Sequence, residues 1–75
     1  MPHVTVKVFP GRSEAQKRDL ADRITQALQQ ALDSSDRSIS IAIDEVAADD
    51  WTAKVYDPEI RPHLDRLYKK PGYQP

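Results

Sequence analysis

Two segments of alternating apolar and polar residues enclose one amphipathic segment, and this order leaves the chain very few folds to adopt. Residues 2–9 carry an apolar side chain at every second position, and residues 39–44 repeat the pattern (Val4, Val6 and Val8; Ile39, Ile41 and Ile43). A period of two is typical of a β-strand with one buried face. Two such strands joined through a helix form a βαβ unit with parallel strands and a right-handed crossover. The sequence therefore predicts an α/β fold.

The segment between the two predicted strands carries the signals of a helix. Residues 10–12, Pro-Gly-Arg, predict a turn. Ser13 and Gln16 fit a capping box, in which the serine hydroxyl accepts from the third helical amide and the glutamine reaches back. Apolar residues then recur at helical spacing (Leu20, Ile24, Ala27, Leu28, Ala31 and Leu32). We expect an amphipathic helix that ends near residues 33–35 and lies on the sheet.

The C-terminal third has a less regular pattern and predicts two short helices. Asp50 is expected to cap a helix that runs to Tyr56, and Asp57-Pro58 resembles a second helix start. Because proline lacks an N–H, Pro58 or Pro62 is expected near the start of the second helix or at a kink. The fold class is thus a βαβ unit with a helical C-terminal part.

Composition limits the chain to a thin core. With 75 residues, 39% of them hydrophobic, we expect one domain over residues 1–75. A core this small usually needs disulfides, a metal or a partner subunit, and the lack of cysteine removes disulfides and thiolate ligands. His3 and His63 show no metal-ligand spacing, so no metal site is expected. Oligomerisation remains as the source of added stability.

Charge and hydropathy argue against two classes of partner. The chain has eleven Lys and Arg and 12 Asp and Glu, which give a net charge of -1. It therefore lacks the excess of basic residues that nucleic-acid binding requires. The apolar stretches are far shorter than the roughly 20 residues that span a bilayer, and the start lacks the apolar region of a signal peptide. We therefore expect a cytoplasmic protein with no membrane or nucleic-acid partner.

Pro2 is the most informative position for chemistry. Removal of Met1 would expose its ring nitrogen as a secondary amine. An α-amine has a pKa of about 7.7–8, and an apolar site or a nearby cation lowers that pKa. Such an amine is a general base at neutral pH and can move a proton between carbon and oxygen of an enolisable substrate. Taken alone, however, Met-Pro is also a common start to a chain.

Several motifs together resemble the 4-oxalocrotonate tautomerase family. They are Met1-Pro2, the alternating strand, and Gly11-Arg12-Ser13 before a helix that contains Gln16-Lys17; the similarity runs from Pro2 to about Trp51. The resemblance implies that Pro2 is the catalytic base, that Arg12 binds the substrate carboxylate, and that the whole chain is a single tautomerase domain. A solvated loop arginine is the alternative interpretation of Arg12.

A finer resemblance points to the bacterial phenylpyruvate tautomerase subgroup. It rests on the start Met1-Pro2-His3, residues 38–42, Trp51 and the ending of residues 69–73. It implies a homodimer whose protomers pair into a four-stranded sheet, and an aryl or alkyl 2-hydroxyacrylate that is converted to its 2-keto acid. No cofactor is implied.

Two features depart from the best-known members: the residue at position 40, and the C-terminal part, which forms a hairpin in hexameric members but is predicted to be helical here. Ser40 stands where those members carry a second arginine, so it offers only a hydroxyl to the substrate carbonyl and disfavours diacid substrates. Trp51 matches the aromatic wall of the family's pocket, or fills a core beneath the second helix. His3 lies next to Pro2, but an exposed or satisfied histidine is the simpler interpretation, and we leave it outside the predicted site.

Two alternatives remain open at this point. One is another reaction on the same scaffold, such as hydration-type dehalogenation or decarboxylation of a small acid, for which Asp44, Glu45 or Asp49 would have to activate water. The other is a non-catalytic oligomerising module. Retention of Met1 would favour the module, because Pro2 would then be a tertiary amide without a basic nitrogen.

Overall fold

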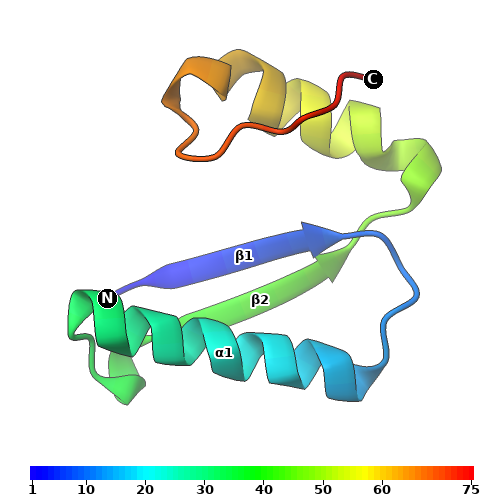
Figure 1. Cartoon of the computed structure of the whole chain (residues 1–75). Coiled ribbons are helices and arrows are strands. Elements are labelled where there is room, and N and C mark those ends of the chain that lie inside the picture. The colour runs from blue at the N-terminus through cyan, green and yellow to red at the C-terminus, as the bar shows by residue number, and fades with distance from the viewer. The chain divides into compact units, whose positions relative to one another are not determined.

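The computed structural model describes all of residues 1–75 and contains two compact units, Met1–Glu45 and Val46–Pro75 (Figure 1). The first unit holds the two strands and the long helix, and the second holds short helices and the C-terminal tail. The expectation of a single domain over residues 1–75 stays a prediction.

The first unit is the predicted βαβ unit. Its elements are β1 (His3–Val8), α1 (Glu14–Leu32), the 3-10 turn η1 (Asp36–Ser38) and β2 (Ser40–Glu45). The two strands pair in parallel, from His3 opposite Ser40 to Val8 opposite Glu45. Helix α1 runs along one face of this sheet (Figure 1). The predictions of two strands, a connecting helix and parallel pairing are confirmed, with bounds that agree to about two residues.

Both ends of α1 follow from local sequence. The Ser13 hydroxyl accepts from the Gln16 amide at 3.1 Å, and the Gln16 side chain accepts from the Ser13 amide at 2.9 Å, so the capping box is confirmed. Gly11 turns the chain before the helix with φ of 126°, which L side chains rarely adopt. Asp33 ends the helix in the left-handed conformation, with φ of 55°, a position usually taken by glycine.

The first unit lacks a closed core. None of its residues is fully buried, and even the valines of β1 and the isoleucines of β2 are only half-buried. The reason is geometrical, since one helix covers one face of a sheet and two strands leave both sheet edges without a neighbour. The opposite face carries His3, Thr5 and Lys7 on β1 beside the alternate residues of β2. The unit therefore needs further cover to be stable.

The second unit corrects two predictions. Its helical elements are η2 (Ala48–Asp50), η3 (Thr52–Ile60) and η4 (Arg61–Arg66), which are a 3-10, a π and a 3-10 helix. The cap predicted at Asp50 is wrong, because this residue ends η2 and its carboxylate accepts from Lys54 at 3.2 Å. The helix start predicted at Asp57-Pro58 is also wrong, because η3 continues through Pro58.

A wider helical turn explains how η3 accommodates a proline. The Arg61 amide bonds to the carbonyl of Tyr56, five residues earlier. This π-type spacing suits a segment in which Pro58 offers no N–H and its ring would crowd a regular α-turn. Pro62 stands near the start of η4, where a missing N–H costs nothing, as predicted. Val55 and Tyr56 form the buried centre, with 5% and 2% of their surface exposed.

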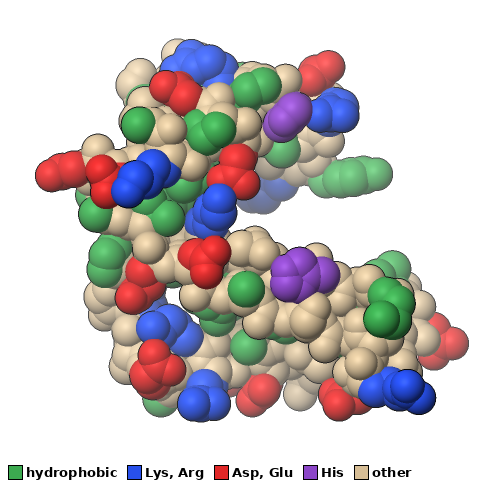
Figure 2. Space-filling view, turned by 180° about the vertical axis from the view of Figure 1, so that it is seen from behind, with side chains coloured by type: hydrophobic (Ala, Val, Ile, Leu, Met, Phe, Trp, Pro, Cys, Tyr) green, Lys and Arg blue, Asp and Glu red, His purple; other side chains and the backbone are tan.

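Surface charge is dispersed rather than segregated. Figure 2 shows basic and acidic side chains interspersed on the visible face of both units, without a continuous surface of one sign. None of the helices combines the length and the apolar character that a bilayer crossing requires.

Candidate active site

Pro2 is held at the start of the sheet. Its carbonyl accepts a hydrogen bond from the Ser40 amide at 3.2 Å, one residue before the regular ladder begins. Pro2 is half-buried, whereas Met1 is fully exposed. Loss of Met1 would therefore remove no packing and would leave the ring nitrogen fixed by the strand behind it.

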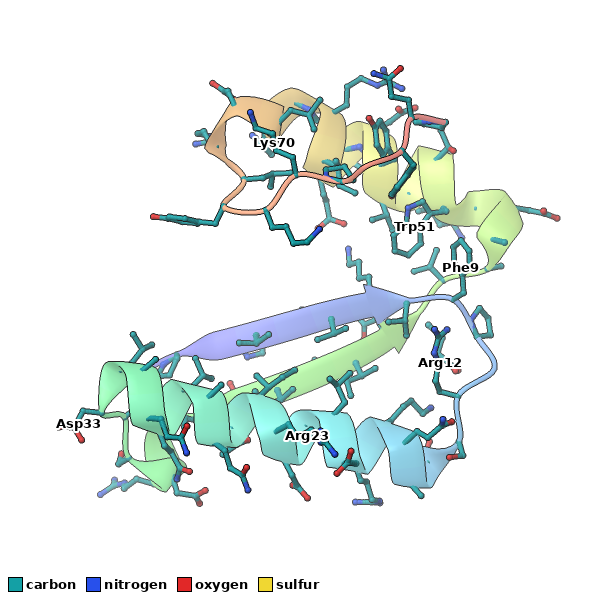
Figure 3. All side chains as sticks on the ribbon, in the orientation of Figure 1. Phe9, Arg12, Arg23, Asp33, Trp51 and Lys70 are labelled. Atoms are coloured by element: carbon teal, nitrogen blue, oxygen red, sulfur yellow. The ribbon has the colours of Figure 1, made fainter.

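Arg12 lies at the other end of the sheet from Pro2. It follows β1 in the connection to α1, and Figure 3 shows it beyond the end of that strand. Its guanidinium donates to the Phe9 carbonyl at 3.2 Å, and no carboxylate pairs with it. Since the six-residue β1 is about 20 Å long at roughly 3.3 Å per residue, one chain does not bring Arg12 to its own Pro2.

The location of Arg12 suits an anion. Arg12 precedes Ser13, the N-cap of a 19-residue helix. The positive end of the helix dipole and a guanidinium without a carboxylate partner both favour a negative group at this place.

Ser40 lies beside His3 on the face of the sheet that α1 does not cover. The Ser40 hydroxyl and His3 Nδ1 are 2.6 Å apart, and Thr5 Oγ1 lies 3.4 Å from His3 Nε2. All three residues are exposed. The parallel register explains this cluster, because it places residue 3 opposite residue 40. Sequence reasoning left His3 outside the site, although the two predicted strands contained the signal.

Trp51 belongs to the second unit and is held by a neighbouring aromatic residue. Its indole N–H donates to the Tyr73 hydroxyl at 2.8 Å. The Tyr73 ring in turn lies 5.6 Å from the ring of Tyr56, tilted by 49°, and the Arg61 guanidinium lies 5.0 Å from the centre of the Tyr56 ring. Sequence analysis missed Tyr73, because the contact joins two residues that are 22 positions apart.

A cavity of about 620 Å³ opens beside this aromatic cluster. Its lining comes from η3, η4 and the tail (Tyr56, Leu64, Lys70, Pro71, Gly72, Tyr73 and Gln74). Its walls are thus partly aromatic, with Lys70 as its cation.

One of the acidic residues considered for water activation, Glu45, already faces a cation. The Lys17 ammonium lies 2.9 Å from a Glu14 oxygen and 3.7 Å from a Glu45 oxygen, so Glu45 already faces a cation. The hydrogen bond from Lys17 lowers the pKa of Glu14, and the same bond raises the pKa of Lys17. No cluster of three or more His, Cys, Asp or Glu residues is arranged to hold a metal ion.

Comparisons with known proteins place the chain in a family. The family model described as "Tautomerase enzyme" matches residues 2–56. Tautomerase PptA of Cronobacter sakazakii is 47% identical over 75 residues, 99% of each chain, and that of Pectobacterium carotovorum is 49% identical over 74 residues, 97% of each.

Solved structures agree with this assignment. The crystal structure of YwhB, described as a homologue of 4-oxalocrotonate tautomerase, is 38% identical and superimposes with a TM-score of 0.62 over 64% of this chain and 79% of that one. A structure from work on 4-oxalocrotonate tautomerase isozymes of Methylibium petroleiphilum is 28% identical, with a TM-score of 0.64 over 67% and 81%. The chain therefore belongs to the tautomerase family, has its βαβ fold, and is an isomerase.

Proposed function

We propose that this tautomerase interconverts the enol and keto forms of 2-keto acids such as phenylpyruvate, with the nitrogen of Pro2 as general base after Met1 is removed. The observation that carries the proposal is the attachment of Pro2 to β2 through the Ser40 amide, at 3.2 Å. A base held this way stays in one position and needs no reorganisation before proton transfer. The fully exposed Met1 is open to removal.

The proposed reaction is a 1,3-proton shift. Arg12 binds the carboxylate of the 2-hydroxyacrylate, and the Ser40 hydroxyl donates to the oxygen on the adjacent carbon. Pro2 takes the proton of the enol hydroxyl, which leaves an enolate and a protonated ring nitrogen. The nitrogen then returns a proton to the neighbouring carbon, which gives the 2-keto acid and regenerates the base. The substrate is neither oxidised nor reduced, so the step requires no cofactor.

The length of β1 supports a homodimer. Because β1 separates Pro2 from Arg12 by about 20 Å, a complete site needs the arginine of a second copy. If two copies pair their β1 strands antiparallel around a two-fold axis, the start of one strand lies beside the end of the other. This pairing forms a four-stranded sheet and gives each Pro2 the Arg12 of the other chain. It also covers one of the open sheet edges.

Trp51 is proposed to form an apolar wall for the aryl group of the substrate. Its indole is held by the hydrogen bond to Tyr73 at 2.8 Å, so its ring keeps one orientation. A fixed aromatic surface binds another ring with little loss of side-chain entropy.

No observation favours the alternative reactions. Water activation would require an acidic side chain near the base, and Glu45 faces Lys17 at 3.7 Å. Membership of the tautomerase family also leaves no support for a non-catalytic module.

The first test is the ketonisation of enol-phenylpyruvate, followed by ultraviolet absorbance. Three proteins are compared: the chain with a free Pro2, the same chain with Met1 retained, and Pro2→Ala, each checked by mass spectrometry. We expect rapid turnover only with a free Pro2 and a loss of about 10²–10⁴-fold in the other two, since this is the usual contribution of a general base. Equal rates with and without Met1 would refute Pro2 as the base.

A further inference from the structure

The shortest polar contact on the exposed sheet face joins His3 to Ser40. Nδ1 of His3 lies 2.6 Å from the Ser40 hydroxyl oxygen, and Nε2 lies 3.4 Å from Oγ1 of Thr5. A hydroxyl carries a single proton, so the direction of the short bond decides whether Ser40 still has a proton to donate elsewhere.

Two arrangements of protons are chemically possible. In one, Ser40 donates to Nδ1, and its proton is no longer available to a substrate. In the other, Nδ1–H donates to the Ser40 oxygen, and the hydroxyl proton is free. A neutral imidazole has one donor and one acceptor nitrogen, and the hydrogen bond at the second nitrogen selects the tautomer. The Thr5 hydroxyl, 3.4 Å from Nε2, is able to donate to it, and in that arrangement the proton of the neutral ring lies on Nδ1.

Ser40 is also close to the proposed base. Its amide bonds to the Pro2 carbonyl at 3.2 Å, so the backbone of the serine and that of the proline are joined directly. The side chains of His3 and Ser40 are exposed. A hydroxyl at this position reaches solvent and any substrate that approaches the end of the sheet.

We propose that His3 is a positioning residue of the tautomerase, which donates from Nδ1 to Ser40 so that the serine hydroxyl points its proton at the substrate oxygen. This inference rests on the proposed function, in which that oxygen becomes negative when Pro2 removes the enol proton. A donor fixed in direction stabilises the enolate more than it stabilises the bound enol. The effect of His3 therefore falls on kcat rather than on KM.

A double-mutant cycle tests the inference. We expect Ser40→Ala to lower kcat about 10–100-fold, somewhat less than the loss of a buried oxyanion donor. His3→Ala should lower kcat about 10-fold with KM nearly unchanged, and the double variant should be no slower than Ser40→Ala. His3→Asn, whose side-chain amide can donate from nearly the place of Nδ1, should recover most of the rate. The matched control is His63→Ala in η4, which should keep the parent kcat.

Three results would overturn the inference. The first is a double variant whose loss of kcat equals the product of the two single losses, and the second is a Ser40→Ala variant as fast as the parent. The third is a His3→Asn variant as slow as His3→Ala, while both variants melt at the parent temperature. Failure of the proposed function has another signature, because Pro2→Ala would then keep the parent rate. If Pro2→Ala loses activity as expected, but the losses of kcat in His3→Ala and Ser40→Ala multiply in the double variant, only the role of His3 is refuted.

Discussion

Two variants that are each slow at substrate concentrations well below KM should restore activity when they are mixed, if Pro2 and Arg12 of one site come from different copies. The six-residue β1 keeps these residues about 20 Å apart within one chain. Pro2→Ala keeps its arginine, and Arg12→Ala keeps its base. Random pairing of equal amounts makes half of the dimers mixed, and each mixed dimer contains one intact site and one doubly defective site. About a quarter of all sites should therefore be active.

The assay compares rates of enol-phenylpyruvate ketonisation before and after subunit exchange. The variants are unfolded, mixed and refolded together, and mass spectrometry of intact dimers confirms the exchange. Each variant alone passes through the same treatment. A second mixture, of the parent chain with the Pro2→Ala/Arg12→Ala double variant, should lose half of the parent's activity, because only parent–parent dimers then keep intact sites.

Sites within one chain would give the opposite results. The two single variants would then show no recovery after exchange, and the parent chain would keep its full activity beside the double variant. Either finding, with exchange confirmed, would refute the assignment of Arg12 to the site of a second copy.

Three further predictions address the carboxylate, the helix start and pH. Arg12→Ala should raise KM for the 2-keto acid about 10–100-fold by removing a charge-assisted hydrogen bond, and kinetics with the methyl ester should change much less. Ser13→Ala should lower the free energy of unfolding by about 1 kcal/mol in urea melts, because it removes the bond to the first turn of α1, whereas Ser35→Ala, at a cap without a side-chain bond, should leave it nearly unchanged. The pKa of Glu14 is lowered and that of Lys17 is raised by their bond, so the bond stabilises the fold above the ordinary pKa of 4.5 and below that of 10.5. The melting temperatures of the parent and of Lys17→Gln should therefore differ most between pH 4.5 and pH 10.5. The two melting temperatures should converge as the pH falls below 4.5, where Glu14 is protonated, and as it rises above 10.5, where Lys17 loses its charge.

The βαβ unit and the start of α1 could be predicted because their determinants are local. Alternation along residues 2–9 specifies a strand whatever lies beside it, and the Ser13 hydroxyl finds the Gln16 amide within the same turn. The helical character of the second unit was also predicted correctly, but its helix starts were not, because the competing prolines gave no single answer. Because the backbone forms a wider, π-type turn around Pro58, η3 continues past Asp57-Pro58, where the sequence indicated the start of a new helix.

Candidate site residues divide in the same way. Pro2, Arg12 and Ser40 stand out by residue type and by position in the chain. The sequence by itself therefore determined the candidates for base, carboxylate ligand and hydroxyl donor, and also the pair of parallel strands beside which they lie. Only the tertiary structure decided which of these candidates meet. The register brings His3 and Ser40 to 2.6 Å, and the length of β1 keeps Arg12 from the Pro2 of its own chain. The physical reason is that residue type and periodicity are properties of neighbouring positions, whereas contacts between distant positions depend on strand register and on the path of the chain between them.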